Sequence, residues 1–139
     1  MKKILFASSI IAFASCTNTK EVKKDDIKHL AGFWEISSVS TESNETINYE
    51  VNEFVDYFQL ENDQGFRQKV SPNLDGSFQS NSMKEDFTVV DSLGTFYIKY
   101  QTPFNQWKEE IIKIDSLNFT VKNEMGNTYF YKKFHPKNK

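Results

Sequence analysis

The stretch that decides the fold is Thr95-Phe96-Tyr97-Ile98-Lys99-Tyr100-Gln101. Its apolar residues Phe96, Ile98 and Tyr100 alternate with a more polar set, and a period of two residues predicts a β-strand with one buried face. The side chains of Phe96, Ile98 and Tyr100 are therefore expected to point into the protein core.

Similar short runs of β-branched and aromatic residues occur on both sides of this stretch. Most of them are joined by a few residues rich in Asn, Asp and Gly, which suit tight turns. Connections this short leave no room for a crossover helix, so neighbouring strands should pair antiparallel. The expected strands are 33–39, 54–60, 66–70, 77–82, 87–90, 95–100, 107–114, 117–121 and 128–134.

A meander of eight or nine strands leaves two exposed edges unless it closes on itself, and closure into a barrel removes both. The sequence therefore predicts an all-β protein, an antiparallel up-and-down barrel of about eight strands. A short N-terminal helical turn is expected over 26–31, with Asp25 or Asp26 as its N-cap and Gly32 at its end.

The alternation test assigns inward-facing residues in the other strands as well. Residues 107–114 stay ambiguous, because Trp107 and Ile111 share one parity while Ile112 and Ile114 share the other, and a bulge or a two-faced strand would explain this. Elsewhere the inward sets are Phe54, Phe58 and Leu60 with Asp56 near an end, Phe87 and Val89, and Leu117, Phe119 and Val121.

The first sixteen residues have the layout of a bacterial secretion signal: two lysines, a short apolar run and small residues before the only cysteine, Cys16. Residues 13–16, Phe-Ala-Ser-Cys, resemble a lipobox. The resemblance implies that residues 1–15 are removed and that Cys16 carries lipid, which anchors the protein to a membrane of the bacterial envelope. The alternative is an ordinary signal peptide cut near Ala14, with Cys16 an incidental thiol.

Residues 16–27 are almost wholly polar and are expected to form a tether. Within them, 24–26 faintly resembles the export signal of surface lipoproteins in Bacteroidetes-type bacteria, and a solvated charge run explains the same residues. The predicted organisation is a signal peptide at 1–15, the tether at 16–27, a barrel domain at 28–135 and a tail at 136–139.

Two segments of the barrel resemble lipocalin-like domains. Residues 30–36, Leu-Ala-Gly-Phe-Trp-Glu-Ile, are similar to the opening Gly-x-Trp segment of that family, and residues 112–119 and 127–133 are similar to its closing hairpin. Small bacterial lipocalin-like lipoproteins of the Bacteroidetes type often combine these features with a lipobox. The resemblance covers about 28–134 and implies a ligand-binding barrel.

The resemblance also implies structural roles for Gly32 and Trp34. In lipocalins the tryptophan packs across the closed end of the barrel beneath a basic side chain from the last strand. Lys132 is assigned that basic position, with Lys133 as the neighbouring alternative. A lysine can stack on an indole ring, although it lacks the flat guanidinium of arginine.

Composition excludes several classes of function. Removing 1–15 takes away two of the 17 basic residues and leaves all 19 acidic ones, so the formal charge moves from −2 to −4. A mildly acidic chain without a basic block is a poor nucleic-acid binder. The two histidines have no metal-ligand spacing, Asn73 to Gly76 matches a turn better than a calcium loop, and no motif for catalysis or a cofactor occurs. The sequence predicts neither an enzyme nor a metal protein.

Two functions remain open. One is a lipid-anchored binding module that holds a small hydrophobic ligand in the barrel. The other is a non-catalytic interaction or structural lipoprotein, an inhibitor or accessory subunit of an envelope complex, whose barrel is filled by its own side chains. Tyr129, Tyr131 and Lys133 share a face that would form either a ligand rim or an outward aromatic cover. The candidate ligand-binding residues are Phe58, Leu60, Phe96, Ile98, Tyr100 and Phe119.

Overall fold

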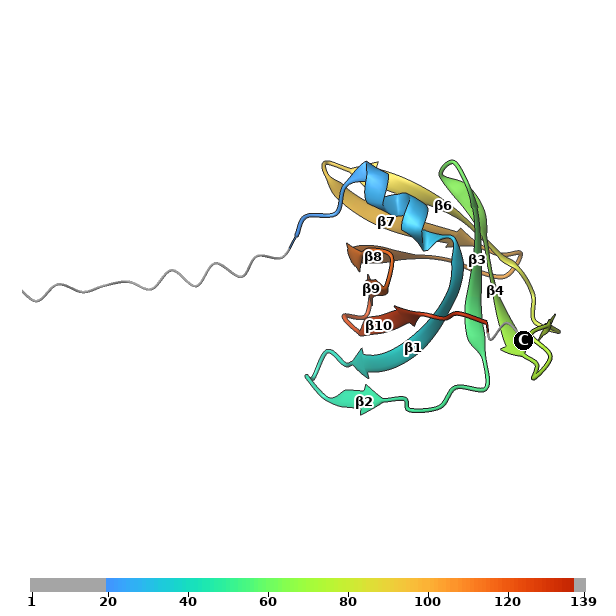
Figure 1. The fold of residues 1–139 in the computed structure, drawn as a ribbon. Helices are drawn as coiled ribbons and strands as arrows, with labels where there is room; N and C mark the ends of the chain where they lie inside the picture. Colours follow the sequence, from blue (N-terminus) through green and yellow to red (C-terminus); the bar gives the residue numbers. More distant parts are fainter. Residues whose placement is uncertain (1–19, 137–139) are drawn as a thin grey trace, which may run out of the picture.

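The computed structural model describes residues 20–136 and, within them, contains one short helix and ten strands (Figure 1). Cys16 and the predicted signal peptide lie outside the described residues, as do the last three residues of the tail. The elements are η1 (Lys24–Leu30), β1 (Gly32–Ser40), β2 (Thr46–Asn48), β3 (Val55–Glu61), β4 (Gln64–Pro72), β5 (Phe78–Gln79), β6 (Glu85–Ser92), β7 (Thr95–Gln101), β8 (Gln106–Ile114), β9 (Asn118–Asn123) and β10 (Thr128–Lys133).

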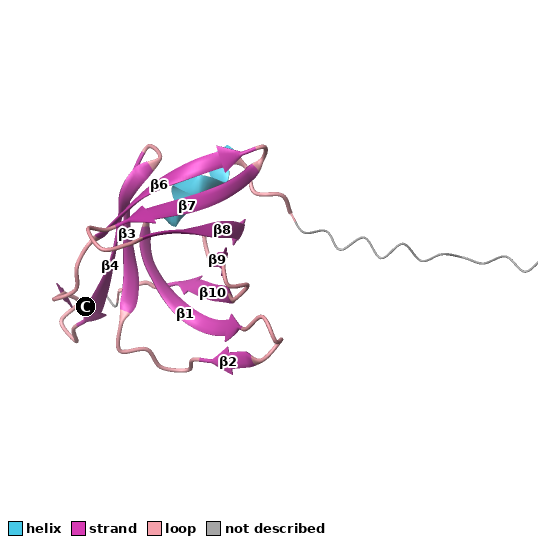
Figure 2. Cartoon of the chain, turned by 180° about the vertical axis from the view of Figure 1, so that it is seen from behind, coloured by secondary structure: helices cyan, strands magenta, loops and turns pink. Residues whose placement is uncertain are grey.

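Eight of these strands form a closed antiparallel barrel in the order β1-β3-β4-β6-β7-β8-β9-β10. The barrel closes because β10 pairs with β1 along a register that runs from Trp34 opposite Lys133 to Ser40 opposite Thr128. The short strand β2, which Figure 2 shows beside β1, is an addition that pairs with β1, and the short strand β5 is an addition that pairs with β4. The predicted fold class is confirmed, and only β2 has no counterpart in the prediction.

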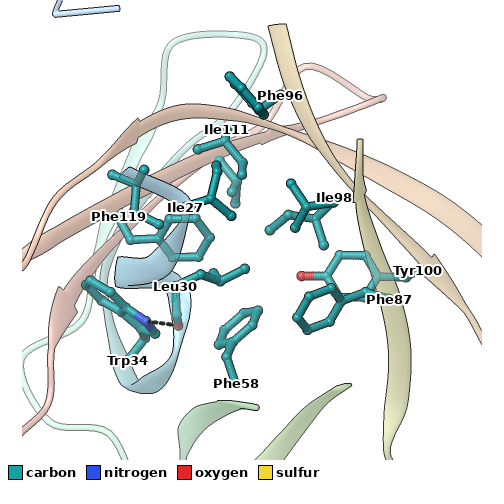
Figure 3. Packing of buried hydrophobic residues seen from close by; sticks show 13 residues of the cluster. Ile27, Leu30, Trp34, Phe58, Phe87, Phe96, Ile98, Tyr100, Ile111 and Phe119 are labelled. Atoms are coloured by element: carbon teal, nitrogen blue, oxygen red, sulfur yellow. Dashed lines mark hydrogen bonds between the residues drawn. The ribbon is translucent and has the colours of Figure 1, made fainter. Parts of the chain in front are cut away.

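The interior of the barrel is filled with apolar side chains from every side (Figure 3). Phe96, Ile98 and Tyr100 all lie in it, as the alternation in β7 predicts. At about 25 cal/mol for each Å² of buried apolar surface, a core of this kind is the main source of stability. It consists of Ile27, Leu30, Trp34, Phe58, Phe87, Val89, Phe96, Ile98, Tyr100, Ile111, Ile114, Phe119 and Val121.

A bulge explains the ambiguous pattern of β8. The register between β8 and β9 shifts between Ile111 and Lys113, so the strand gains one residue there. Ile111 and Ile114 are both buried as a result, while Ile112 is exposed. The extra residue exchanges the two faces of the strand, and this is why neither parity alone fits the sequence.

Two predicted inward residues are wrong, because both lie just outside a strand. Phe54 precedes β3 and is exposed, and it lines a surface cleft with Lys69. Leu117 is exposed in the turn between β8 and β9, where the Asp115 carboxylate accepts hydrogen bonds from two backbone N–H groups, one of them that of Leu117 at 2.8 Å. The alternation rule fails at both positions because it holds only within the pleated ladder.

Helix η1 covers one end of the barrel, the closed end, and inserts the buried side chains of Ile27 and Leu30. The helix starts two residues earlier than predicted, after Lys23, whose backbone N–H donates to the Asp26 carboxylate at 2.9 Å. Val22 also packs against the core. The predicted tether of 16–27 is therefore too long, because its last residues belong to the folded domain.

Trp34 is completely buried and joins the helix to the barrel. Its indole N–H donates a hydrogen bond of 2.8 Å to the Leu30 carbonyl. The Nζ of Lys133 lies 4.3 Å from the centre of its ring and donates to the Ala31 carbonyl at 2.6 Å. Burial lowers the pKa of Lys133 below its ordinary value.

The assignment of the basic position to Lys132 is corrected to Lys133. Lys132 has the opposite parity on β10, and its Nζ faces the Glu35 carboxylate at 3.7 Å. Gly32 has a φ of +113°, and a Cβ there would lie 2.8 Å from the Nζ of Lys133. The backbone conformation therefore favours glycine at this position, and a Cβ there would also displace the flexible end of the Lys133 side chain.

Candidate functional site

The predicted ligand-binding residues do not share one accessible surface. Phe58, Ile98 and Phe119 are almost fully buried in the packed core, and Phe96 lies with them. Leu60 is half-buried and lines a cleft of about 450 Å³ beneath η1, at the closed end. Tyr100 differs from these residues, because its hydroxyl contacts a set of charged side chains in the other half of the barrel.

This set of charged side chains lies in the half of the barrel toward the end that η1 does not cover, the open end. It comprises Asp56, Arg67, Lys69, Glu85 and Glu109 and is referred to as the charged cluster. The Arg67 guanidinium is at its centre and makes a two-pronged ion pair with Glu85, Nε to Oε1 and Nη2 to Oε2, both at 3.1 Å. Fork-to-fork pairs of this kind are among the stronger charge-assisted hydrogen bonds.

Arg67 also packs against an aromatic stack. Its Cζ lies 4.4 Å from the centre of the Tyr100 ring, and its Nη1 donates to the Tyr100 hydroxyl at 3.4 Å. The Tyr100 ring is stacked on Trp107, with ring centres 5.0 Å apart and planes 14° apart. Cation, phenol and indole thus form one column, which fixes the guanidinium in orientation.

Two further carboxylates complete the charged cluster. The Glu109 carboxylate lies 3.8 Å from the Nη1 of Arg67. Asp56 on β3 is buried and accepts a hydrogen bond of 3.2 Å from Lys69, the residue opposite it on β4. Two cations therefore face three carboxylates, and negative charge is in excess when all of them are ionised.

Burial changes the proton affinities of this region. Burial raises the pKa of Glu109, while the nearby Arg67 and a hydrogen bond with Tyr100 oppose the rise. Burial also raises the pKa values of the Tyr100 and Tyr131 hydroxyls well above the ordinary range, so both stay protonated at neutral pH. Burial alone would lower the pKa of Arg67, but Tyr100 and the surrounding carboxylates raise it, so the guanidinium keeps its charge.

Tyr129 and Tyr131 on β10 point into the barrel, whereas Phe130 between them is exposed. Tyr131 is stacked on Phe119 with ring centres 5.5 Å apart, and Tyr129 packs against the core while its hydroxyl accepts a hydrogen bond from Asn123 at 3.3 Å. This excludes the interpretation of both rings as an outward cover. The half-buried ring of Trp107 is stacked on Tyr100 beside Arg67, and the half-buried Tyr131 lies close to Asp56, so aromatic rings border the charged cluster.

Within the described residues, every buried side-chain nitrogen and oxygen has a hydrogen-bond partner. The charged cluster is thus internally satisfied and preorganised. It can present hydrogen-bond donors and acceptors at fixed positions between aromatic rings. A few convergent polar groups with shifted pKa values, set among aromatic side chains, are typical of small-molecule sites.

The described clefts with the largest volumes lie elsewhere. One of about 840 Å³ runs over the outer surface of β3, β4, β6 and β7 and is lined mainly by polar residues such as Gln59, Gln64 and Gln101. A second, of about 770 Å³, is bordered by Phe54 and β5. Both are wide open to solvent, and neither has the convergent ionisable groups of the barrel interior.

The calcium-loop and metal-site interpretations of the sequence can be placed on the structure. Asn73 to Gly76 forms a turn closed by a 3.1 Å hydrogen bond from the Gly76 N–H to the Asn73 carbonyl. Among residues 20–136, no group of three or more His, Cys, Asp or Glu side chains is arranged to hold a metal ion. The helix in this part of the chain is too short and too polar to cross a bilayer.

No protein-family model and no curated protein matches this sequence. Among solved structures, the fold is similar to a lipocalin-like protein from Bacteroides uniformis ATCC 8492, with 11% identity, a TM-score of 0.49, and coverage of 76% of this chain and 99% of that chain. It is also similar to lobster apocrustacyanin A1, with 12% identity, a TM-score of 0.40, and coverage of 83% and 72%. The assignment of the fold rests on the closed sheet itself.

Proposed function

We propose that this chain is a lipid-anchored, non-enzymatic binding lipoprotein of the bacterial cell envelope, of the Bacteroidetes type. The acylated Cys16 is the anchor, and the charged cluster with its aromatic surround is the site for a small amphipathic ligand. The anchor is supported by the secretion signal and the lipobox-like residues 13–16.

The observation that carries the binding proposal is the burial of Arg67 and Glu109 inside the barrel. Their side chains are only 15% and 12% exposed. Buried ion pairs rarely add net stability, and apolar residues of the same size would fill the space at least as well. The charges therefore have no evident use for folding, and a binding role explains why they face the interior at the open end.

The site selects for a certain ligand chemistry. Deep entry is blocked, because Phe58, Ile98 and Phe119 fill the core. A ligand at the open end would place an apolar part against Trp107 and the β10 tyrosines and a polar part against the charged cluster. Because carboxylates outnumber cations there, an uncharged or cationic polar group is favoured over an anionic one such as that of a fatty acid.

The test is titration of the full chain in detergent with matched fluorescent amphiphiles that carry cationic, uncharged or anionic heads. We expect the cationic series to bind best and Glu109→Gln to weaken it about tenfold, which corresponds to 1.4 kcal/mol. The matched control is Glu110→Gln, since Glu110 has the opposite parity on β8 and lies opposite Tyr97 on β7. Equal binding by both variants, or no binding by any amphiphile, would refute the site.

Anchoring is tested separately by mass spectrometry of the N-terminal peptide from the membrane fraction of the producing bacterium. We expect a chain that begins at Cys16 and carries acyl groups. A free Cys16 thiol in the soluble fraction would refute the anchor and would leave the binding proposal untouched.

A second candidate function is interaction with an envelope protein partner through a filled barrel. It is favoured by exposed apolar side chains on three loops at the open end, Val51, Phe104 and Met125. Surface leucines and aromatics are common singly, but several at one end of a domain can mark a docking surface. Crosslinking in intact cells tests it, with wild type expected to capture a partner that a Phe104→Ser variant loses.

A further inference from the structure

The turn between β6 and β7 exposes a leucine in an unusual backbone conformation. Ser92 lies opposite Thr95, so the hairpin loop has only two residues, Leu93 and Gly94. Both have positive φ, +53° for Leu93 and +88° for Gly94. The Leu93 side chain is fully exposed.

Folding does not explain a leucine at this position. Two-residue hairpin loops with positive φ at both positions favour Asn or Asp followed by Gly. The β3–β4 hairpin of the same barrel, with the two-residue loop Asn62-Asp63, meets that preference at its first position, where Asn62 has a φ of +57°. Leu93 instead has a conformation that is uncommon for leucine and leaves its side chain in water.

The N-terminal segment reaches the barrel next to this turn. Val22 packs against the core, and the Glu21 carboxylate oxygen lies 3.8 Å from the position that a Cβ on Gly94 would occupy. Figures 1 and 2 both show the first described residues entering the barrel beside the β6–β7 hairpin. A group that is covalently attached to the chain a few residues before Lys20 is therefore held near Leu93.

Cys16 lies four residues before Lys20 in the sequence. Four extended residues span at most about 14 Å, at up to 3.6 Å for each residue. The interfacial layer of a bilayer leaflet is about 5–7 Å thick. If Cys16 carries acyl chains, the short connection holds the closed end of the barrel against the membrane surface.

We propose that the β6–β7 turn docks on the lipid bilayer and inserts Leu93 into its interfacial region. The inference rests on the lipid anchor proposed above. The exposed Leu117, in the β8–β9 turn at the same end of the barrel, would contact the same surface. Lysines and carboxylates are mixed around both turns, so apolar contact rather than charge holds the turn in place. The open end, with the charged cluster, then faces away from the membrane.

The experiment uses the acylated full chain in vesicles of phosphatidylethanolamine and phosphatidylglycerol at 3:1. A nitroxide is attached to Leu93→Cys, the only free thiol once Cys16 is acylated. The matched control is Leu74→Cys, because Leu74 is equally exposed but lies in the loop between β4 and β5 at the open end. We expect the label at 93 to be accessible to oxygen and shielded from a water-soluble nickel chelate, with the reverse at 74.

A second pair of variants separates membrane contact from folding. Leu93→Asn should raise Tm in detergent by about 3–5 °C, because Asn tolerates the left-handed conformation, whereas Leu74→Asn should leave Tm unchanged. A lower Tm for Leu93→Asn would show that the leucine serves folding and would overturn the proposal. A label at 93 that is exposed to water on an acylated chain would overturn it while the anchor stands, and an unmodified Cys16 would overturn both.

Discussion

Replacement of Trp34 by alanine should be among the most damaging single changes in this protein. The indole is 0% exposed, contacts Phe119 with ring centres 5.4 Å apart, and lies beneath the ammonium of Lys133. Truncation of a buried tryptophan costs about 3–5 kcal/mol. The substitution also removes the hydrogen bond from the indole N–H to the Leu30 carbonyl, so we expect a loss at the upper end of this range, about 4–5 kcal/mol.

The assay is urea unfolding followed by far-ultraviolet circular dichroism. Domains of this size are stable by about 5–15 kcal/mol, so Trp34→Ala would unfold at much lower urea than wild type. Trp34→Phe keeps a ring in place and should cost about 1–3 kcal/mol, and most of this loss measures the contribution of the indole hydrogen bond to stability. The control is Trp107→Ala, whose ring is half-buried and stacked on Tyr100, with an expected loss of about 1–2 kcal/mol.

The reasoning would be refuted if Trp34→Ala cost less than about 1 kcal/mol. Such a result would place the indole at the surface and η1 away from the barrel. A loss as small for Trp34→Ala as for Trp107→Ala would likewise show that the closed end is not packed around this residue.

The remaining predictions concern the charged cluster and one glycine. Arg67→Met leaves two carboxylates unpaired inside the barrel and should cost about 3–5 kcal/mol at pH 7, measured by urea unfolding, whereas the exposed Lys132→Met should cost at most about 1 kcal/mol. Burial raises the folded pKa of Glu109 above its unfolded value of about 4.3, so its stabilising contribution is complete below that pH and is lost as pH rises through the folded pKa. The free energy of unfolding of Glu109→Gln, measured with urea, should therefore increase relative to that of wild type as the pH rises from about 4 to 7. A difference that stays constant with pH would contradict the burial of Glu109. Gly65→Ala should prevent correct formation of the β3–β4 hairpin, seen as insoluble expression or a large loss of Tm, because the added methyl would overlap the Gln59 carbonyl; normal folding would disprove the close approach.

The barrel could be predicted from the sequence because its signal is local. The alternation of Phe96, Ile98 and Tyr100 and the short turns determine strands and their antiparallel order. Phe54 and Leu117 were misplaced because the end of a strand is set by hydrogen bonding and turn geometry, which the pattern of hydrophobicity does not record. The bulge in β8 left only an indirect sign in the sequence, because Trp107 and Ile111 indicate one inward face and Ile112 and Ile114 indicate the other.

The charged cluster was missed for a different reason. Charged side chains within strands ordinarily face solvent, and the residues of the charged cluster belong to no catalytic or metal-binding sequence motif. Glu109 shares parity with Trp107 and Ile111, so the alternation rule itself would have placed it inside. Arg67 carries no such signal, because its inward position follows from its pairing with Phe58 and Glu85 on the neighbouring strands, which is set only by the assembled barrel.

The closure of the barrel by β1 and β10 also constrains how the chain folds. Trp34 lies opposite Lys133, so the last pairing joins residues about a hundred positions apart. Contacts of such long range make folding slow, on the order of milliseconds to seconds. When a chain crosses a membrane with its N-terminus first, β1 emerges long before β10. One edge of β1 then stays unpaired until β10 has emerged. Under the export proposed above, completion of the native state therefore coincides with arrival of the final strand, and any factor that protects open strand edges would act in that interval.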